Sequence, residues 1–492
     1  MRKYIGLLIL AAGTFALQGC GDFLEEQSQS EIIPQTASDF SELLIGSGYP
    51  DNYTPDFSFV EYLDDDCEGY LDKTGYDENW NIIEGFAGES ESITPLPYYS
   101  WQPYMMDQNG YGTRINTSAS ATSYAGFYEK IMGCNAVLDE IDNARGTQED
   151  RDRVKAEALA IRAMFYFQLV NLYGEPYNYN KEALGVPLKL NANLSKDGIA
   201  RSTVAEVYEN VIVPDLQEAA KLMDPLEIVY QNYRINQPCI HILLSRVYLF
   251  MERYQDCIDE ANKALESGIR LMNLTTELGN AYQEYQYNPF TYSNPEILWI
   301  FGTGTRVGNT NYWSGHASGL RALFDQTNDM RWYQYGLTLY YDNAVIYKPY
   351  GSSGLSQNIR TAEAYLNKME AEALLGKTAD ANNDLNTFCR NRIVSYADVN
   401  LSGDELLTTI RNERRKEFCF EGFRWFDLRR QGMPEITHVY KAEKGGPKLV
   451  YTLQHNDPMY TLPFPSVLFE KNVELQQNEC RNVAERQAEI AE

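Results

Sequence analysis

The segment that decides the fold is SRVYLFMERYQDCIDEANKALESG, residues 245–268. Its apolar residues recur at spacings of three and four, as at Val247, Ala261, Ala264 and Leu265. This spacing is typical of amphipathic helices that bury one face. Small and large residues alternate along the segment, which lets two helices pack closely. The segment therefore predicts a helix–turn–helix unit.

The same period recurs along the chain and indicates stacked helix pairs. It is found in segments 123–173, 203–267 and 361–431. The alternation of small and large residues resembles a tetratricopeptide repeat. Such units bury a continuous core only when they stack, so three or four pairs can form a scaffold. Pro214 predicts a kink in the second segment, because proline lacks a hydrogen-bond donor and clashes with the preceding turn.

Two long segments without helical period lie between these pairs. Residues 47–122 and 270–358 are rich in Gly, Pro, Asn, Tyr and Trp. Loops of this length inside a compact protein are usually functional or disordered, and the aromatic content argues against disorder. Residues 296–301, EILWIF, predict a short strand through their β-branched and aromatic side chains.

The composition excludes some classes of function. The 492 residues include 42 Lys and Arg against 69 Asp and Glu, a formal net charge of −27. Nucleic acid is therefore not expected as a partner, because phosphate binding needs a basic face. Only 4 His are present, which argues against a His-rich metal site. The cysteines after Cys20 are odd in number and widely spaced, so we expect small buried side chains and not a disulfide framework.

The N-terminus has the features of an export signal. Arg2 and Lys3 precede the apolar stretch 5–17, which is shorter than the about 20 residues that a membrane span needs. Gly19 before Cys20 resembles the lipobox of bacterial lipoproteins, in which the cysteine becomes lipid-modified. We therefore expect a signal peptide at 1–19 and a single mature domain at 20–492, anchored to a membrane by a lipid and not inserted through it.

The run ERRKEFCFEGFRWFDLRR, residues 413–430, resembles the signature helix of the SusD/RagB family, the surface nutrient-binding lipoproteins of Bacteroidetes-type bacteria. The resemblance covers nearly the whole chain. Further segments similar to the family, in chain order, are residues 20–24, 157–163, 294–298, 328–331 and 462–465. Their order makes the set highly specific.

This resemblance implies a mostly α-helical fold. About four tetratricopeptide-like helix pairs would pack against a largely irregular, loop-rich ligand-binding side with short strands. The protein would sit in the outer membrane, held by lipid at Cys20 and facing the cell exterior, as a lid over a SusC-like TonB-dependent transporter. The usual cargo of the family is an oligosaccharide, and some members serve peptide uptake. No cofactor and no metal are implied.

The signature run has the residue types of a catalytic site, but we interpret it as structural. Glu413, Glu417 and Glu421 are four residues apart among basic neighbours, so charge pairing at i,i+4 explains them. A retaining glycosidase needs two carboxylates about 5 Å apart across a sugar cleft, and the sequence gives no positive sign of such a pair. Asp64–Asp66 could ligate calcium, but a solvated acidic turn is the favoured interpretation.

Sugar binding without catalysis calls for aromatic faces combined with amides, because sugar hydroxyls need partners once they lose water. Two segments meet this requirement. The candidate residues of the first are Trp80, Tyr98, Tyr99, Trp101 and Tyr104. Those of the second are Tyr282, Tyr285, Asn311, Tyr312 and Trp313. We expect Trp299, Trp332 and Trp425 to serve packing instead.

Several functions remain open from sequence. The leading hypothesis is a non-catalytic surface lipoprotein that hands an oligosaccharide to a transporter. A version of it takes peptide cargo. A surface glycoside hydrolase and a repeat scaffold that binds only protein are the alternatives from other classes.

Overall fold

A computed structural model of the chain describes residues 33–491 apart from short gaps. The gaps are residues 52–54, 56–57, 70–74, 77–81, 84–95, 108–116, 195–196, 278–289, 304–312, 315–317, 335–336, 341–342, 347–354 and 442–445. Residues 1–32 and 492 also lie outside the described part.

The first helices start at well-formed caps. Thr36 and Thr147 each form a capping box, in which their side chains accept from the third residue of the helix. The elements of this part are α2 (Ala37–Leu43), the π-helical η1 (Leu44–Gly48), α4 (Thr117–Leu138) and α5 (Gln148–Tyr173). A close approach fixes α4 against η1, because a Cβ on Gly133 would lie 2.3 Å from the carbonyl oxygen of Ser47.

The next helices include an irregular turn beside Pro214, where a kink was predicted. They are α7 (Val204–Val207), the π-helical η4 (Tyr208–Ile212), α8 (Val213–Met223), α9 (Gln237–Phe250) and α10 (Tyr254–Glu266). Pro214 lies in the first turn of α8, directly after η4. The irregularity predicted at this proline is therefore a π-helical turn inside an otherwise continuous helix.

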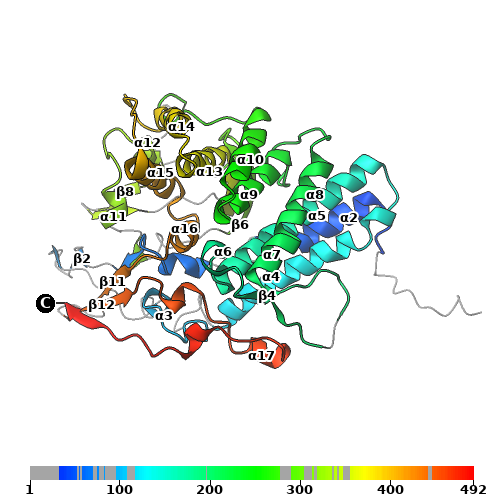
Figure 1. Ribbon diagram of the computed structural model, residues 1–492, viewed down its shortest axis with the longest axis horizontal. Coiled ribbons are helices and arrows are strands. Elements are labelled where there is room, and N and C mark those ends of the chain that lie inside the picture. Colours follow the sequence, from blue (N-terminus) through cyan, green and yellow to red (C-terminus); the bar gives the residue numbers. More distant parts are fainter. Residues whose placement is uncertain are drawn as a thin grey trace, which may run out of the picture.

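The last helices complete the stack. They are α13 (Thr361–Leu374), α14 (Thr378–Arg390), α15 (Gly403–Phe418) and α16 (Arg424–Arg430). Each helix packs on its predecessor in the order α4, α5, α8, α9, α10, α13, and α13 then contacts both α14 and α15. Figure 1 shows the resulting arc of helices, from α2, α4 and α5 at one end to α13–α15 at the other. The predicted mostly α-helical architecture of tetratricopeptide-like pairs is confirmed.

Short strands and short helices make up the rest of the described part. The strand pairs with the longest registers are β6 (Ile297–Thr303) with β10 (Leu355–Arg360), and β11 (Ile436–Tyr440) with β12 (Lys448–Leu453) and β13 (Glu489–Ala491). The others are β1 (Glu68–Gly69) with β7 (Trp313–Ser314), β2 (Gly75–Tyr76) with β3 (Ile82–Ile83), β4 (Leu184–Pro187) with β5 (Arg201–Thr203), and β8 (Leu337–Tyr340) with β9 (Asn343–Ile346). The short helices are η2 (Ser58–Tyr62), α3 (Leu96–Tyr99), η3 (Ile141–Asn143), α6 (Tyr177–Asn180), α11 (Ser318–Arg321), α12 (Met330–Gln334), η7 (Pro458–Tyr460), α17 (Leu468–Lys471) and η8 (Glu479–Asn482). The strand predicted at 296–301 is confirmed as β6.

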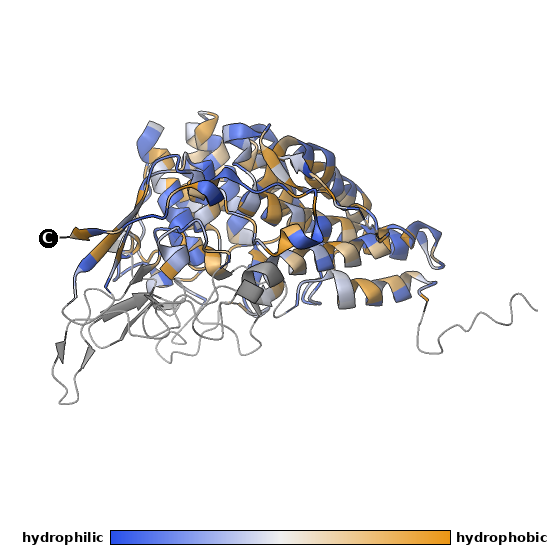
Figure 2. Cartoon of the chain, turned by 90° about the horizontal axis from the view of Figure 1, so that it is seen from below, coloured by the Kyte–Doolittle hydropathy of each residue, from blue (hydrophilic) through white to orange (hydrophobic). Residues whose placement is uncertain are grey.

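The core lies along the inner faces of the helical arc. Apolar and polar residues alternate around the helices in Figure 2, as expected for amphipathic helices that bury one side. Trp299, Trp332 and Trp425 are buried, which confirms that they serve packing. The seven cysteines of the described part are buried and are not joined in disulfides. No helix among the described residues is long and apolar enough to cross a bilayer.

Candidate functional site

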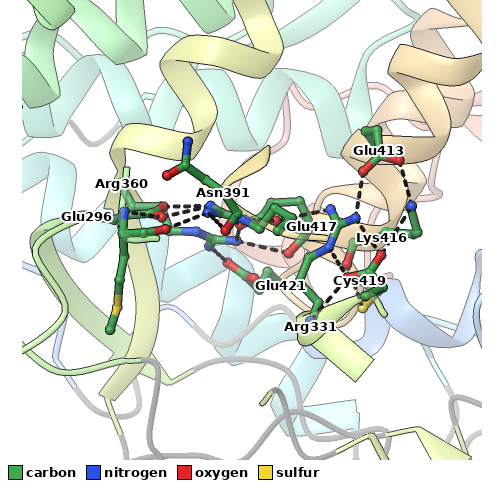
Figure 3. A network of polar contacts seen from close by, with 12 residues as sticks. Glu296, Arg331, Arg360, Asn391, Glu413, Lys416, Glu417, Cys419 and Glu421 are labelled. Atoms are coloured by element: carbon green, nitrogen blue, oxygen red, sulfur yellow. Dashed lines mark hydrogen bonds and ion pairs between the residues drawn. The ribbon is translucent and has the colours of Figure 1, made fainter. Parts of the chain in front are cut away.

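A buried network of guanidinium and carboxylate groups lies where α15 meets the strand pair β6–β10 (Figure 3). Its centre is Glu417 of α15, whose side chain is fully buried. Three arginines from separate segments surround this carboxylate. Arg392 approaches to 3.0 Å, and Arg331 and Arg360 each approach to 3.3 Å.

The network continues from these arginines to further acidic groups. Arg392 pairs with Glu296, the residue before β6, at 2.8 Å. Arg331 pairs with Asp329 at 2.7 Å and with Glu413 at 2.6 Å. These bonds fasten β6 and α12, which belong to the chain between the helix pairs, onto the helical scaffold.

The electrostatics of the network keep Glu417 ionised. Burial alone would raise the pKa of Glu417, but the guanidinium groups of Arg392, Arg360 and Arg331 outweigh burial and hold that pKa well below its usual value. A general acid must carry a proton at the working pH, and Glu417 does not. Glu417 is therefore a buried counter-ion that holds neighbouring segments together, which agrees with the structural interpretation of the signature run.

The predicted i,i+4 pairing of the signature carboxylates was wrong for Glu417 and Glu421, although Glu413 does pair within its own helix, with Lys416 at i,i+3. The sequence pattern indicated i,i+4 pairing on one helical face, whereas Glu417 pairs with arginines of other elements. The helix α15 ends at Phe418, so Glu421 lies beyond it. Spacing along one helix cannot reveal partners that the tertiary fold brings from elsewhere.

A pocket that combines aromatic rings with amides lies next to this network. Its volume is about 50 Å³. It is lined by Phe167, Gln168, Arg246, Phe250, Phe301, Gln357, Asn358, Glu421, Gly422, Phe423 and Phe426. These residues come from α5, α9, β6, β10, the segment between α15 and α16, and α16 itself. We call this the aromatic–amide pocket.

The network holds the polar wall of the aromatic–amide pocket. Glu421 accepts hydrogen bonds from Arg360 and from the Asn358 amide, the latter at 3.3 Å. Arg246 on the opposite helix is fixed by a bidentate pair with Glu363, at 2.5 and 2.7 Å. A fixed polar wall is what selective binding needs, because it does not have to be ordered by the ligand.

One polar atom in the pocket lacks a hydrogen bond. The side-chain oxygen Oε1 of Gln168 is buried and has no partner. A buried carbonyl oxygen without a donor costs free energy, of order 1–3 kcal/mol. Because Gln168 lines the pocket, a ligand hydroxyl that reaches this oxygen would satisfy it.

Three of the predicted ligand-binding aromatics are packed in the core. Tyr98, Tyr99 and Trp101 are 3%, 0% and 0% exposed. The rings of Tyr99 and Trp101 stack on His438, with centroids 4.1 and 4.2 Å away. The Trp101 indole donates to the carbonyl of Leu63 at 3.0 Å. These rings hold the segment onto β11, which corrects the prediction that they face a ligand.

The other predicted site residues keep the status of predictions. Tyr104 is partly exposed, and Trp313 pairs with Gly69 between β7 and β1 through its backbone. The side chain of Trp313 lies outside the described part, as do all of Trp80, Tyr282, Tyr285, Asn311 and Tyr312. Cys20 also lies outside it.

The acidic turn at residues 64–66 is not solvated, so that prediction was wrong. Asp64 and Asp66 are 3% and 2% exposed. Arg424 donates to Asp65 at 2.6 Å and Arg415 donates to Asp66 at 2.7 Å. Within the described ranges, no group of three or more His, Cys, Asp or Glu side chains is arranged to hold a metal ion.

The phenylalanines and amides of the aromatic–amide pocket were missed from the sequence. The phenylalanines were assigned to no site because each lies in a helical or strand pattern that core packing explains. Gln357 and Asn358 lie in the segment 270–358, where no pattern singled them out. Gln168 carried the one available signal, because it is a polar residue inside the apolar run of α5. A single such residue does not locate a pocket built from six segments.

Comparison with known families agrees with this architecture. Residues 22–249 match the model of a family described as starch-binding and associating with the outer membrane. Residues 251–480 match the model of the SusD family. The chain belongs to the SusD family. Membership implies a carbohydrate-binding protein associated with the outer membrane.

Individual relatives are distant. A SusD-like protein from Formosa agariphila is 23% identical over 303 residues, which are 60% of this chain and 51% of the relative. The match thus spans about half the length of that relative. Two solved structures from Bacteroides vulgatus share the fold. One has a TM-score of 0.69 at 23% identity and covers 91% of this chain and 99% of its own. The other, described as a SusD-like carbohydrate-binding protein, has a TM-score of 0.63 at 23% identity and covers 90% and 97%.

Proposed function

We propose that this SusD-family protein is a cell-surface lipoprotein that binds an oligosaccharide and delivers it, chemically intact, to a SusC-like TonB-dependent transporter. The observation that carries the proposal is the aromatic–amide pocket, in which phenylalanine rings and three carboxamides meet. Pyranose rings offer apolar C–H faces for aromatic packing and hydroxyls for amide hydrogen bonds. The pocket therefore combines both kinds of contact that a sugar needs.

The size of the pocket sets how much ligand it holds. A volume of about 50 Å³ accommodates part of one sugar residue and not a chain. We assign the remaining contacts to the predicted aromatic segments. Their candidates are Trp80, Tyr104, Tyr282, Tyr285, Asn311, Tyr312 and Trp313.

The charges around the aromatic–amide pocket support binding without catalysis. The acidic residue that lines it is Glu421, which is already paired with Arg360. Glycoside hydrolysis uses two carboxyl groups, one of them a proton donor with a raised pKa. A single arginine-paired carboxylate does not supply that pair.

Anchoring is assigned to Cys20. Its place after the apolar stretch 5–17 and Gly19 supports lipid modification. A Cys20→Ala variant expressed in the native host should move from the membrane fraction to the soluble or secreted fraction. If this variant stays in the outer membrane, the lipid anchor at Cys20 is disproved.

Binding and catalysis can be tested together. Purified protein should bind one class of oligosaccharide in calorimetry against a panel of starch, mucin and plant glycans and peptides, and chromatography should show no shortened products. Peptide binding without glycan binding would favour the peptide-uptake version. Released products would establish the hydrolase alternative. Binding to neither class would leave a protein-binding scaffold.

The transporter partnership has its own test. Affinity purification of the tagged protein from detergent-solubilised outer membranes should recover a TonB-dependent transporter at near-equal amounts. A matched sample with the Cys20→Ala variant controls for contacts formed after lysis. Recovery of no transporter would contradict the delivery step while leaving glycan binding intact.

A further inference from the structure

A second pocket lies in the helical stack, away from the aromatic–amide pocket. It is formed by α10, α13, α14 and the turn between the last two. Its volume is about 290 Å³. Its lining residues are Gln255, Ile258, Asp259, Asn262, Lys368, Glu372, Lys377, Asp380, Asn383 and Asp384. No lining residue is shared with the aromatic–amide pocket.

The lining carries more negative than positive charge. Four carboxyl groups face two lysines. Lys368 is already engaged, at 2.9 Å from Asp384 and 3.7 Å from Glu372. Lys377 donates to the side-chain oxygen Oε1 of Gln255 at 2.7 Å, so its ammonium group is bonded to a neutral amide and not to a carboxylate.

Glu372 is incompletely satisfied. The residue is 3% exposed, and in the ionised form its buried oxygen Oε2 accepts no hydrogen bond, whereas in the protonated form its carboxyl group bonds to the Asp384 carboxylate. Burial and the neighbouring Asp384 carboxylate raise the pKa of Glu372 to about 8. Near neutral pH this carboxyl group holds a proton, which a bound cation would displace.

The arrangement distinguishes between kinds of cation. A metal ion needs several carboxylates that converge on one point, and the described part of the chain contains no such group of three. Here the acids are spread around a pocket several times larger than an ion, with Asp259 and Asp380 on the exposed rim. Such spacing suits a group that has several donors on an extended frame.

We propose that this pocket binds an organic cation through a guanidinium or primary ammonium group. The cationic head lies against Glu372 and Asp384, and the rim acids and the amides of Asn262 and Asn383 hold the rest. The source of the cation is either a free amine or a basic side chain of a peptide, because both present the same head group.

Calorimetry with agmatine, which carries both head groups, tests the proposal on the full mature chain. Affinity should rise at least threefold from pH 7 to pH 9, with proton release visible as a heat that depends on the buffer. Glu372→Gln and the rim variant Asp380→Asn should each weaken binding at least fivefold. Glu405→Gln, an exposed acid on α15, is the matched control and should bind like the parent.

The probes also distinguish the sources and the alternatives. Binding of agmatine but not of an acetylated Gly-Arg-Gly amide indicates a free amine, and binding of both indicates an accessible side-chain site. Two results would overturn the proposal. One is tighter binding of calcium chloride than of agmatine. The other is no agmatine binding when agmatine is in 10-fold excess over protein at millimolar concentration. Circular dichroism of Glu372→Gln shows whether its loss of binding reflects unfolding, and Asp380→Asn remains the test if it does.

Discussion

The helices α5 and α15 are both buried, but they are buried by different chemistry. Apart from Glu157, Arg162 and Asn171, the buried side chains of α5 are apolar or aromatic. The buried side chains of α15 include Glu413, Arg414, Lys416 and Glu417, which are residue types that are rarely buried unless they are paired. The helix α5 is held mainly by apolar surface removed from water, and α15 is held mainly by ion pairs.

The difference reflects what each helix must hold. α5 packs against neighbours in the stack, and apolar faces tolerate small adjustments of such packing. α15 must fix α12, β6 and β10, which come from a long segment without repeat pattern. Directional guanidinium pairs accept only a narrow range of positions, so they specify where that segment docks. We take this specificity as the role of the buried charges, since buried pairs are weak sources of net stability.

The largest expected effect comes from neutralising the centre of the network. Glu417→Gln keeps the size of the side chain but leaves Arg331, Arg360 and Arg392 without their shared counter-ion. Loss of one partner from a buried ion pair costs about 3–5 kcal/mol, so the free energy of unfolding should fall by about 4 kcal/mol in urea denaturation.

The control is Glu218→Gln, whose partner Lys221 lies 2.9 Å away on the exposed face of α8. Exposed pairs contribute about 0–1 kcal/mol, so this variant should be nearly neutral. If both variants change the free energy of unfolding by the same amount, the buried ion pairs contribute no more than exposed ones.

An acid titration examines a second buried charged group, Glu370 of α13, which pairs with Arg430 and Arg411. Burial alone would raise the pKa of Glu370, but Arg430 and Arg411 outweigh it and lower that pKa to about 2. Because the folded pKa lies below the unfolded value of 4.5, this group stabilises the fold above pH 4.5 and the contribution disappears as pH falls through 2. The contribution is about 3 kcal/mol.

Thermal unfolding followed from pH 6 to pH 2 checks this expectation. The Glu370→Gln variant should be less stable than the parent at pH 6, and the gap should narrow as the pH approaches 2. A gap that stays constant across this range would mean that the ionised form of Glu370 contributes nothing.

The apolar side should respond far less to a change of similar size. Ile161→Val in α5 removes one methylene group from a fully buried side chain. Such a change costs about 1 kcal/mol in transfer and cavity terms. Urea denaturation of this variant and of Glu417→Gln, under the same conditions, measures the contrast between the two helices. If Ile161→Val lowers the free energy of unfolding as much as Glu417→Gln does, the two helices do not differ in this way.

The same contrast explains which features the sequence revealed. Apolar spacing in segments such as 203–267 predicts helices because the helical period depends only on residues three and four positions apart in the sequence. The strand at 296–301 and the irregularity at Pro214 were predictable for the same local reason. The pairing of Glu417 was not, because its three partners are 25 to 86 residues away in the chain.

Burial of the aromatic segment was equally hidden. Tyr98, Tyr99 and Trp101 lie in an irregular stretch rich in amides, which is also the composition of a ligand site. Their role is decided by His438, which lies more than 300 residues later and stacks on two of the rings. The phenylalanines of the aromatic–amide pocket are the opposite case. Local patterns assign them to packing, and only the fold brings them together with the amides.

The smallest expected effect separates the two roles within α5 itself. Gln168→Leu removes the buried carbonyl oxygen that lacks a partner, so stability should stay equal or rise by up to about 1 kcal/mol. Affinity for the glycan identified by the panel should fall about fivefold, because a ligand hydroxyl loses its acceptor. Gln148→Leu, in the exposed first turn of the same helix, should leave affinity unchanged. If both variants bind the glycan as the parent does, Gln168 does not contribute to recognition, and the sugar contacts must lie wholly in the other aromatic segments.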